Sequence, residues 1–288
     1  MKPTMLIGGA TGATGKAATK LLLEAGFPVR AFVHKEDQRS ELLKAQGAEI
    51  FIGDTLDFRA VRRAFDGIDR AYFVYPMRPG LVQATTNFAQ AARGVKAEFI
   101  VNMSQRTAVS NAPSDSALQH WLGEQIFDWA GTPVTHLHPT AFAEWLFYMR
   151  TMIRDGRYAV AFEATGHFAP IAAEDQGAVI AAILADPHSH AGKTYSLSGP
   201  EELTPPQIAE IVGKVLGKPV RYEKIGGAQW VREVTGQDIP FLVQHIDAIA
   251  EMHRDGLMAG TTDTVKKIIG RNPLTLAQFV EKNRAVWM

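Results

Sequence analysis

Three glycines near the start of the chain have the spacing of a turn that binds phosphate groups. Gly9, Gly12 and Gly15 form a G-x-x-G-x-x-G pattern between an apolar stretch at 5–7 and a second one at 17–23. We interpret this as a strand, a tight turn and a helix, whose N-terminus directs free backbone N–H groups and its positive dipole end at the turn. The first glycine permits the turn, the second lets the backbone approach a pyrophosphate, and the third lets the helix pack close to the strand. The commoner fingerprint is G-x-G-x-x-G, but the surrounding strand and helix favour a dinucleotide site over an ordinary glycine turn.

The end of the second expected strand bears on which dinucleotide is bound. In such sites an acidic residue about 20 residues past the glycines holds a ribose 2′-hydroxyl, whereas basic groups accommodate a 2′-phosphate. Here His34 and Lys35 end the strand, Arg39 lies just beyond, and Glu36 and Asp37 follow slightly late. These residues favour NADP(H) and leave NAD(H) open. The alternative is a solvated charged loop without a binding role.

Polar and aromatic residues also end the later strands. Asp54 ends the third expected strand, at the position that lies beside the adenine in this architecture. Tyr75 and Pro76 end the fourth, followed by Met77, so that this group either lines the pocket near the cofactor or belongs to the core. Ser104 ends the fifth strand, where it could hydrogen-bond the nicotinamide ribose or the substrate, or simply cap the strand.

A histidine and a glutamate stand one helical turn apart in the helix expected over 116–130. His120 and Glu124 share a face at this spacing, and Glu124 could hold the imidazole in its charged form, suited to proton donation near neutral pH. The alternative is an i,i+4 surface pair, which stabilises a helix by about 0.2–0.5 kcal/mol.

Aromatic residues gather in the segment that follows residue 140. Phe142 and Trp145, with Phe147 and Tyr148, could wall a cleft for a flat aromatic substrate. At helical spacing the same set also fits plain core packing.

The composition is typical of a soluble protein and excludes several kinds of site. The 288 residues are 46% hydrophobic and 21% charged, and 30 basic residues balance 30 acidic ones, which gives no reason to expect a nucleic-acid or membrane partner. The chain has no cysteine, which excludes thiolate nucleophiles, disulfides and cysteine-ligated metals. His136 and His138 alternate in a strand and could face one side, but no acidic ligand pattern accompanies them, so we expect no metal site. Neither a G-x-S-x-G elbow nor a complete phosphate-binding P-loop is present.

The start of the chain and its apolar runs bear on location. Residues 1–4 lead directly into a strand, which leaves no room for a signal peptide, and no apolar run reaches membrane-spanning length. We therefore expect a cytoplasmic protein.

The elements that must position these groups alternate between strand and helix. We expect strands near 5–8, 29–33, 49–54, 71–76, 99–104 and 134–139, with helices between them. This alternation predicts an α/β fold, a Rossmann-type doubly wound parallel sheet with ligands at the carboxyl ends of its strands. We expect an NAD(P)-binding domain over 1–150, to which a segment at about 170–200 returns, and a small C-terminal α/β lobe for the substrate over 200–288. One aromatic-rich helix should begin at 140, and the part after 226 should be helical and loose.

The segment Gly9-Ala10-Thr11-Gly12-Ala13-Thr14-Gly15 resembles the opening of the NmrA-like branch of the atypical short-chain dehydrogenase/reductases. Later segments resemble the same branch in order, at 29–34, 53–54, 120–124, 172–178, 192–201 and 203–209. The resemblance implies an extended-type Rossmann domain and a small C-terminal lobe with the substrate cleft between them. It implies NAD(P) binding by Thr11, Gly12, Ala13, Thr14, Gly15, His34, Asp54 and Tyr75.

The resemblance also implies a choice of functions. Some members resemble reductases of quinones, azo dyes or related small acceptors, and others are redox-sensing regulators that bind the cofactor without turnover. The usual Tyr-x-x-x-Lys proton donor is absent, and His120-x-x-x-Glu124 stands in its place. Many relatives carry Arg where His34 stands, a departure for which Lys35 and Arg39 could compensate.

We therefore expect an NAD(P)H-dependent oxidoreductase, with NADPH preferred to NADH, that passes hydride to a small aromatic or electron-poor acceptor such as a quinone or azo compound. Such acceptors need little acid assistance, which suits the missing tyrosine. The alternatives are a non-catalytic NAD(P)-sensing regulator, and a carbonyl or imine reductase that uses His120 as the acid. A small-molecule aromatic substrate is the expected partner, and a homodimer stays open.

Overall fold

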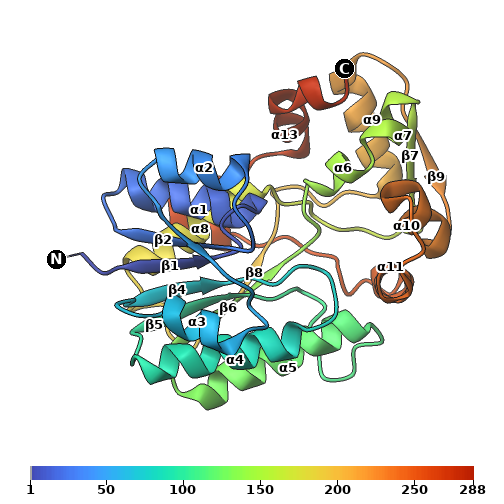
Figure 1. Cartoon of the computed structure of the whole chain (residues 1–288). Helices are drawn as coiled ribbons and strands as arrows, with labels where there is room; N and C mark the ends of the chain where they lie inside the picture. Colours follow the sequence, from blue (N-terminus) through green and yellow to red (C-terminus); the bar gives the residue numbers. More distant parts are fainter. Residues whose placement is uncertain (1) are drawn as a thin grey trace. The chain divides into compact units, whose positions relative to one another are not determined.

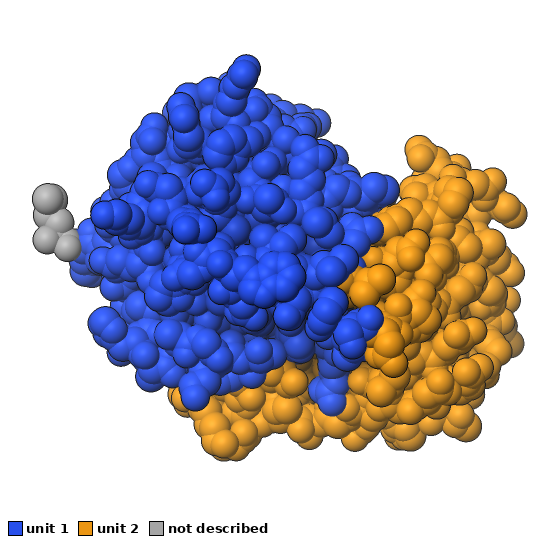
Figure 2. Space-filling view, turned by 90° about the horizontal axis from the view of Figure 1, so that it is seen from below, with its two compact units in different colours: residues 1–110, 119–138, 173–195 blue, residues 111–118, 139–172, 196–288 orange. Residues whose placement is uncertain are grey.

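The computed structural model describes residues 2–288 and divides the chain into two compact units, coloured separately in Figure 2. Unit 1 comprises the residues up to 110 together with 119–138 and 173–195, and unit 2 comprises 111–118, 139–172 and 196–288. The chain thus leaves unit 1 at 111–118 and again after 138, and it returns to unit 1 over 173–195. The cofactor and substrate roles assigned to the two domains stay predictions.

Seven strands form one sheet in the order β3-β2-β1-β4-β5-β6-β8. The strands are β1 (Met5–Gly8), β2 (Val29–Val33), β3 (Glu49–Ile52), β4 (Arg70–Phe73), β5 (Phe99–Met103), β6 (Val134–Pro139) and β8 (Thr194–Leu197). The pairs from β3 through β6 are all parallel. β1 and β5 are buried along their whole length, as expected of parallel strands covered on both faces. The predicted Rossmann-type α/β fold is confirmed. The strand order reverses between β1 and β4, where such sheets bind ligands beyond their carboxyl ends.

Helices cover both faces of this sheet (Figure 1). One face carries α1 (Ala13–Glu24), α2 (Gln38–Ala45) and α8 (Ala173–Ala185), and the other carries α3 (Phe58–Ala64), α4 (Leu81–Gly94) and α5 (Asp115–Ala130). Under the second face the rings of Phe73, Phe88 and Phe127 pack together, with Phe73 and Phe127 5.3 Å apart at 68°. On the first face α8 lies directly against α1. The two helices are so close that a Cβ added to Gly177 would come within 2.4 Å of the Ala17 Cβ.

Unit 2 has its own core and a small parallel sheet. The sheet joins β7 (Arg157–Val160) and β9 (Arg221–Lys224). The helices are α6 (Trp145–Tyr148), α7 (Arg150–Arg154), α9 (Pro205–Leu216), α10 (Gly227–Thr235), α11 (Pro240–Arg254), α12 (Thr264–Ile269) and α13 (Leu276–Lys282), and a 3-10 turn covers Arg284–Val286. Val231, Val280 and Trp287 are almost completely buried in this core, so the part after 226 is packed and not loose as expected.

The single aromatic-rich helix expected from residue 140 is wrong. Residues 141–143 instead pair with an extended segment, because Ile171 N donates to Ala141 O at 2.9 Å and Ala143 N donates to Ile171 O at 3.0 Å. Helix begins only at α6, and Met149 interrupts it before α7 with φ −94° and ψ 15°. Within residues 2–288, no helix combines the length and the apolar character needed to cross a membrane.

Candidate functional site

The turn between β1 and α1 is built so tightly that Gly9 and Gly15 leave no room for a side chain. Gly9 has φ +57°, and a Cβ there would come within 2.6 Å of Val74. Gly12 N donates to Gly9 O at 2.8 Å, which closes the turn. A Cβ on Gly15 would come within 2.5 Å of the same carbonyl oxygen. The predicted reasons for the glycines, a tight turn and a close approach of helix to strand, agree with this geometry.

The N-terminus of α1 faces this turn without a side-chain cap. Gly12 is the N-cap residue, no side chain bonds the first N–H groups, and the first turn carries no acidic residue. Thr11 is half-buried and Ala13 is exposed, whereas Thr14 is buried and its hydroxyl lies 2.8 Å from the Tyr72 hydroxyl. Burial raises the pKa of Tyr72, so this contact joins two neutral hydroxyls. The backbone of the turn, and not the Thr14 side chain, is therefore what an anion would meet.

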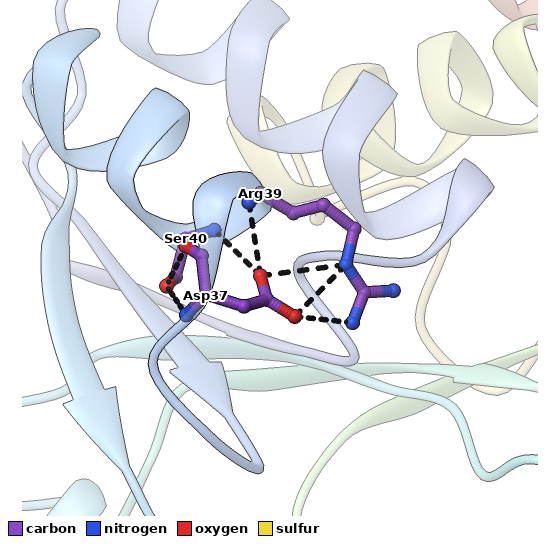
Figure 3. A network of polar contacts seen from close by, with 3 residues as sticks. All are labelled: Asp37, Arg39 and Ser40. Atoms are coloured by element: carbon purple, nitrogen blue, oxygen red, sulfur yellow. Dashed lines mark hydrogen bonds and ion pairs between the residues drawn. The ribbon is translucent and has the colours of Figure 1, made fainter.

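A carboxylate in the loop after β2 and a guanidinium in the first turn of α2 bind each other (Figure 3). Asp37 is the N-cap of α2, where it accepts from the backbone N–H groups of Arg39 and Ser40, and it also accepts from the Arg39 guanidinium at 2.6 Å. The hydrogen bond from Arg39 lowers the pKa of Asp37 to about 2. His34 and Lys35 are exposed in the same loop. Asp37, judged slightly late in the sequence, thus forms an ion pair with Arg39, one of the basic residues predicted to favour NADP(H).

The predicted residues after β3 and β4 make local contacts. Asp54 is half-buried and accepts from Leu56 N at 2.9 Å, which fixes the loop. β4 ends at Phe73, so Tyr75 and Pro76 lie in the loop and not in the strand as expected. Tyr75 is buried and its hydroxyl donates to Pro79 O at 3.0 Å, whereas Pro76 and Met77 are exposed. Pro76 and Met77 are thus the members of this group that present surface.

A buried polar cluster lies between the ends of β5 and β6 and helix α5. Ser104 follows β5, and its backbone N donates to Leu137 O at 2.9 Å. The Glu124 carboxylate is 7% exposed and accepts both from the Ser104 hydroxyl and from His138 Nε2, the latter at 2.7 Å. Burial raises the pKa of Glu124, but the hydrogen bond and charge of His138, with the Ser104 hydroxyl, outweigh it and hold the pKa below its ordinary value. Glu124 is therefore a buried, ionised acceptor.

A second set of contacts runs parallel to this cluster one helical turn further along α5. His136 Nε2 lies 3.1 Å from Asp128 Oδ1, and its Nδ1 lies 2.9 Å from Asn102 Nδ2. His136 and His138 thus both meet α5, on one side of the strand. Residues 2–288 contain no group of three or more acidic or histidine side chains that could hold a metal ion.

The sequence predicted a pair of Glu124 with His120, which stays a prediction, and the structure shows that the Glu124 carboxylate accepts from Ser104 and His138. His120 is half-buried on α5. His138 was missed, because only the packing of β6 against α5 brings it to Glu124. The sequence signal that could have identified His138 as a partner is its position at the end of β6, the strand next to β5, which Ser104 directly follows.

The aromatic candidates belong to unit 2 and contribute to its packing. Phe142 is half-buried and forms a bridge with Ile171. Trp145 stacks on Phe162 at 6.4 Å and 17°, and its ring lies 6.0 Å from that of Trp230. Trp145 is half-buried, so its ring is compatible both with packing in the core and with contact to a ligand at the surface.

Comparisons with known proteins agree with the fold and the turn. A family model described as the NmrA-like family matches residues 1–276. NAD(P)H azoreductase from Xenophilus azovorans is 30% identical over 291 residues, which cover 98% of this chain and 99% of that protein. The NADPH-dependent quinone oxidoreductase from Escherichia coli, solved with NADPH, has a TM-score of 0.83 at 24% identity, covering 97% of this chain and 99% of that one. NmrA, a negative transcriptional regulator solved with NADP, has a TM-score of 0.82 at 18% identity, covering 98% and 95%. The glycine turn, the sheet order and the match over 1–276 lead to one conclusion: the chain belongs to the NmrA-like family.

Proposed function

We propose that the protein is an NAD(P)H-dependent oxidoreductase that passes hydride to a small, flat, electron-poor acceptor such as a quinone or azo compound. The observation that carries this proposal is the turn at Gly9, Gly12 and Gly15, which offers bare backbone and an uncapped helix N-terminus where a pyrophosphate fits. The azoreductase that is 30% identical over nearly the whole chain supports the acceptor class.

Different residues of the chain would bind different parts of the coenzyme. The backbone of Thr11, Gly12, Ala13, Thr14 and Gly15 would bind the pyrophosphate. His34, Lys35 and Arg39 would face the adenosine ribose, Asp54 the adenine, and Tyr75 with Pro76 the coenzyme near the end of β4. When bound, the dihydronicotinamide supplies the hydride.

The preference for NADPH over NADH depends on Arg39. Its guanidinium is 60% exposed but already holds Asp37, so a 2′-phosphate would share it with a carboxylate. His34 and Lys35 add two further exposed basic groups. We therefore propose a modest preference for NADPH.

The acceptor would meet Met77, Phe142 and Trp145, with His120 as the polar group. Quinones and azo compounds take hydride readily, so a strong acid is not required of His120. We further propose a cytoplasmic location, and a homodimer as the assembly.

The test is consumption of NADPH by the purified protein in the presence of a quinone or an azo dye, followed by the absorbance of the coenzyme or the dye. Turnover of either acceptor supports the proposal. Turnover of ketones or imines alone would instead support a carbonyl or imine reductase that uses His120 as its acid.

A non-catalytic NAD(P)-sensing regulator is the second candidate. One observation favours it: the hydroxyl proton of Ser104 is committed to Glu124, which removes one proton donor from the edge of the sheet. Coenzyme binding by calorimetry without consumption across a panel of quinones, azo dyes and ketones would support the regulator.

A further inference from the structure

Ser104 lies at the same edge of the sheet as the glycine turn. It directly follows β5, which pairs with β4 on one side and β6 on the other. Because these strands and β1 are parallel, their carboxyl ends share one edge, which is where such sheets bind dinucleotides. The hydroxyl of Ser104 therefore belongs to the coenzyme-binding edge of unit 1.

The direction of the hydrogen bond to Glu124 decides what Ser104 can offer a ligand. An ionised carboxylate only accepts, whereas a serine hydroxyl has one proton to donate and two lone pairs that accept. Since Glu124 is ionised and buried, the Ser104 proton points to Glu124. Ser104 can then only accept a hydrogen bond from a ligand.

Because Ser104 can only accept, the ligand atom that pairs with it must be a hydrogen-bond donor. A quinone oxygen or an azo nitrogen also accepts and cannot pair with an acceptor, whereas a ribose hydroxyl donates. Loss of the Ser104 proton to a product would also place an alkoxide beside a buried carboxylate, which like-charge repulsion opposes. We propose that Glu124 is a positioning residue that fixes the Ser104 hydroxyl as the acceptor for a hydroxyl of the nicotinamide ribose, so that Ser104 orients the coenzyme and does not protonate the acceptor.

His138 keeps Glu124 in this arrangement. Its Nε2 donates to the same oxygen, Oε1, that receives the Ser104 proton. The carboxylate is thereby held between two donors and cannot turn away from Ser104 without losing a charge-assisted bond. This inference rests on the proposed function, since it requires a nicotinamide coenzyme.

The chain provides a matched control on the same helix. Asp128 stands one turn after Glu124 and holds His136 as Glu124 holds His138, but its side chain is 51% exposed. Asp128→Asn alters a carboxylate–histidine contact without touching Ser104. It should leave coenzyme binding unchanged.

The test compares the dissociation constants of NADPH and of adenosine 2′,5′-bisphosphate, a fragment without the nicotinamide ribose, by calorimetry. We expect Ser104→Ala and Glu124→Met each to weaken NADPH binding roughly two- to tenfold, the value of one hydrogen bond. The double variant should bind NADPH no more weakly than Ser104→Ala alone, because the two residues act through one bond. Glu124→Gln should lie between wild type and Glu124→Met, since its amide oxygen still accepts, and every variant should bind the fragment as wild type does.

Three results would overturn the inference. These are NADPH affinity unchanged in Glu124→Met and Glu124→Gln, losses that multiply in the double variant, or a parallel loss of the fragment. If Glu124→Met does not fold, the cycle is run with Glu124→Gln, for which the same non-additivity is required. If the wild-type protein binds both the fragment and NADPH, and the variants bind NADPH with unchanged affinity, this inference alone is overturned. If the wild-type protein binds neither ligand, the proposed function is overturned as well.

Discussion

Two buried histidines of unit 2 should make the protein lose stability in mild acid. His253 is completely buried between the rings of Phe162 and Phe168, at 4.9 and 5.2 Å, and neither ring nitrogen has a hydrogen-bond partner among residues 2–288. Burial, with a contribution from the charge of His167 and against that of Glu163, lowers its pKa to about 4.

His245 is also buried, at 2% exposure, and its Nδ1 lies 2.7 Å from the Ser114 hydroxyl. Burial lowers its pKa to about 4 as well. Both imidazoles are therefore neutral in the folded protein at neutral pH. As the solution becomes acidic, the unfolded chain binds protons that the folded protein does not, so the free energy of unfolding falls.

The sign and size follow from linkage. The unfolded chain takes up a proton as the pH falls below about 6.5, whereas the folded protein does so only near pH 4, so the free energy of unfolding falls across this window and levels off below it. At 1.36 kcal/mol for each pKa unit, each histidine costs about 2.5 kcal/mol between about pH 7.5 and about pH 4.5. The two together remove a sizeable part of an ordinary domain's stability.

The assay is urea unfolding of wild type and His253→Leu over this pH range. The leucine removes one titrating group, so the pH-dependent loss should shrink by about 2.5 kcal/mol, whatever its effect on stability at neutral pH. His188→Gln is the control, because His188 is exposed and should leave the loss as in wild type. The reasoning is refuted if His253→Leu shows the same pH-dependent loss as wild type.

Three further variants test the glycine turn, the Asp37–Arg39 contact and the packing of α8 on α1. Gly15→Val should abolish NADPH binding in calorimetry, because its Cβ would lie 2.5 Å from Gly9 O, whereas Gly94→Ala, with open space around it, should bind normally. Asp37→Ala should lower the free energy of unfolding through loss of the α2 cap and raise the NADPH-to-NADH affinity ratio by freeing Arg39; an unchanged ratio would contradict the assigned role of Arg39. Gly177→Val should lower the melting temperature by several degrees, since its Cβ would meet Ala17 at 2.4 Å, and unaltered melting would contradict the tight packing of α8 on α1.

The sequence was sufficient where local constraints decide the structure. The turn at Gly9, Gly12 and Gly15 was predictable because its residue types and spacing state the backbone geometry directly. The parallel sheet followed from apolar strands that alternate with helices. Asp57 and Thr204 cap the helices that follow them, and such caps are readable from the sequence because capping depends only on neighbours along the chain.

The sequence was insufficient where distant segments compete with local preference. The aromatic spacing after residue 140 favoured a helix, but hydrogen bonds to residue 171 draw 141–143 into an extended conformation. The contact of Glu124 with His138 was also not predicted, because a neighbour one helical turn away is visible in the sequence and His138 is not. Both outcomes depend on the pairing of segments that only the folded chain brings together.

The division of unit 1 into three chain segments has a consequence for how the protein is made. β8 (Thr194–Leu197) is the strand that covers the outer side of β6, and α8 (Ala173–Ala185) is the helix that packs against α1. A ribosome that has released only the first 150 residues has therefore exposed a bare strand edge on β6 and an uncovered face on α1, both prone to association with other nascent chains. Completion of the seven-stranded sheet must wait for the emergence of β8, so a shortened gene that ends near 150 should yield aggregates and not a smaller folded protein.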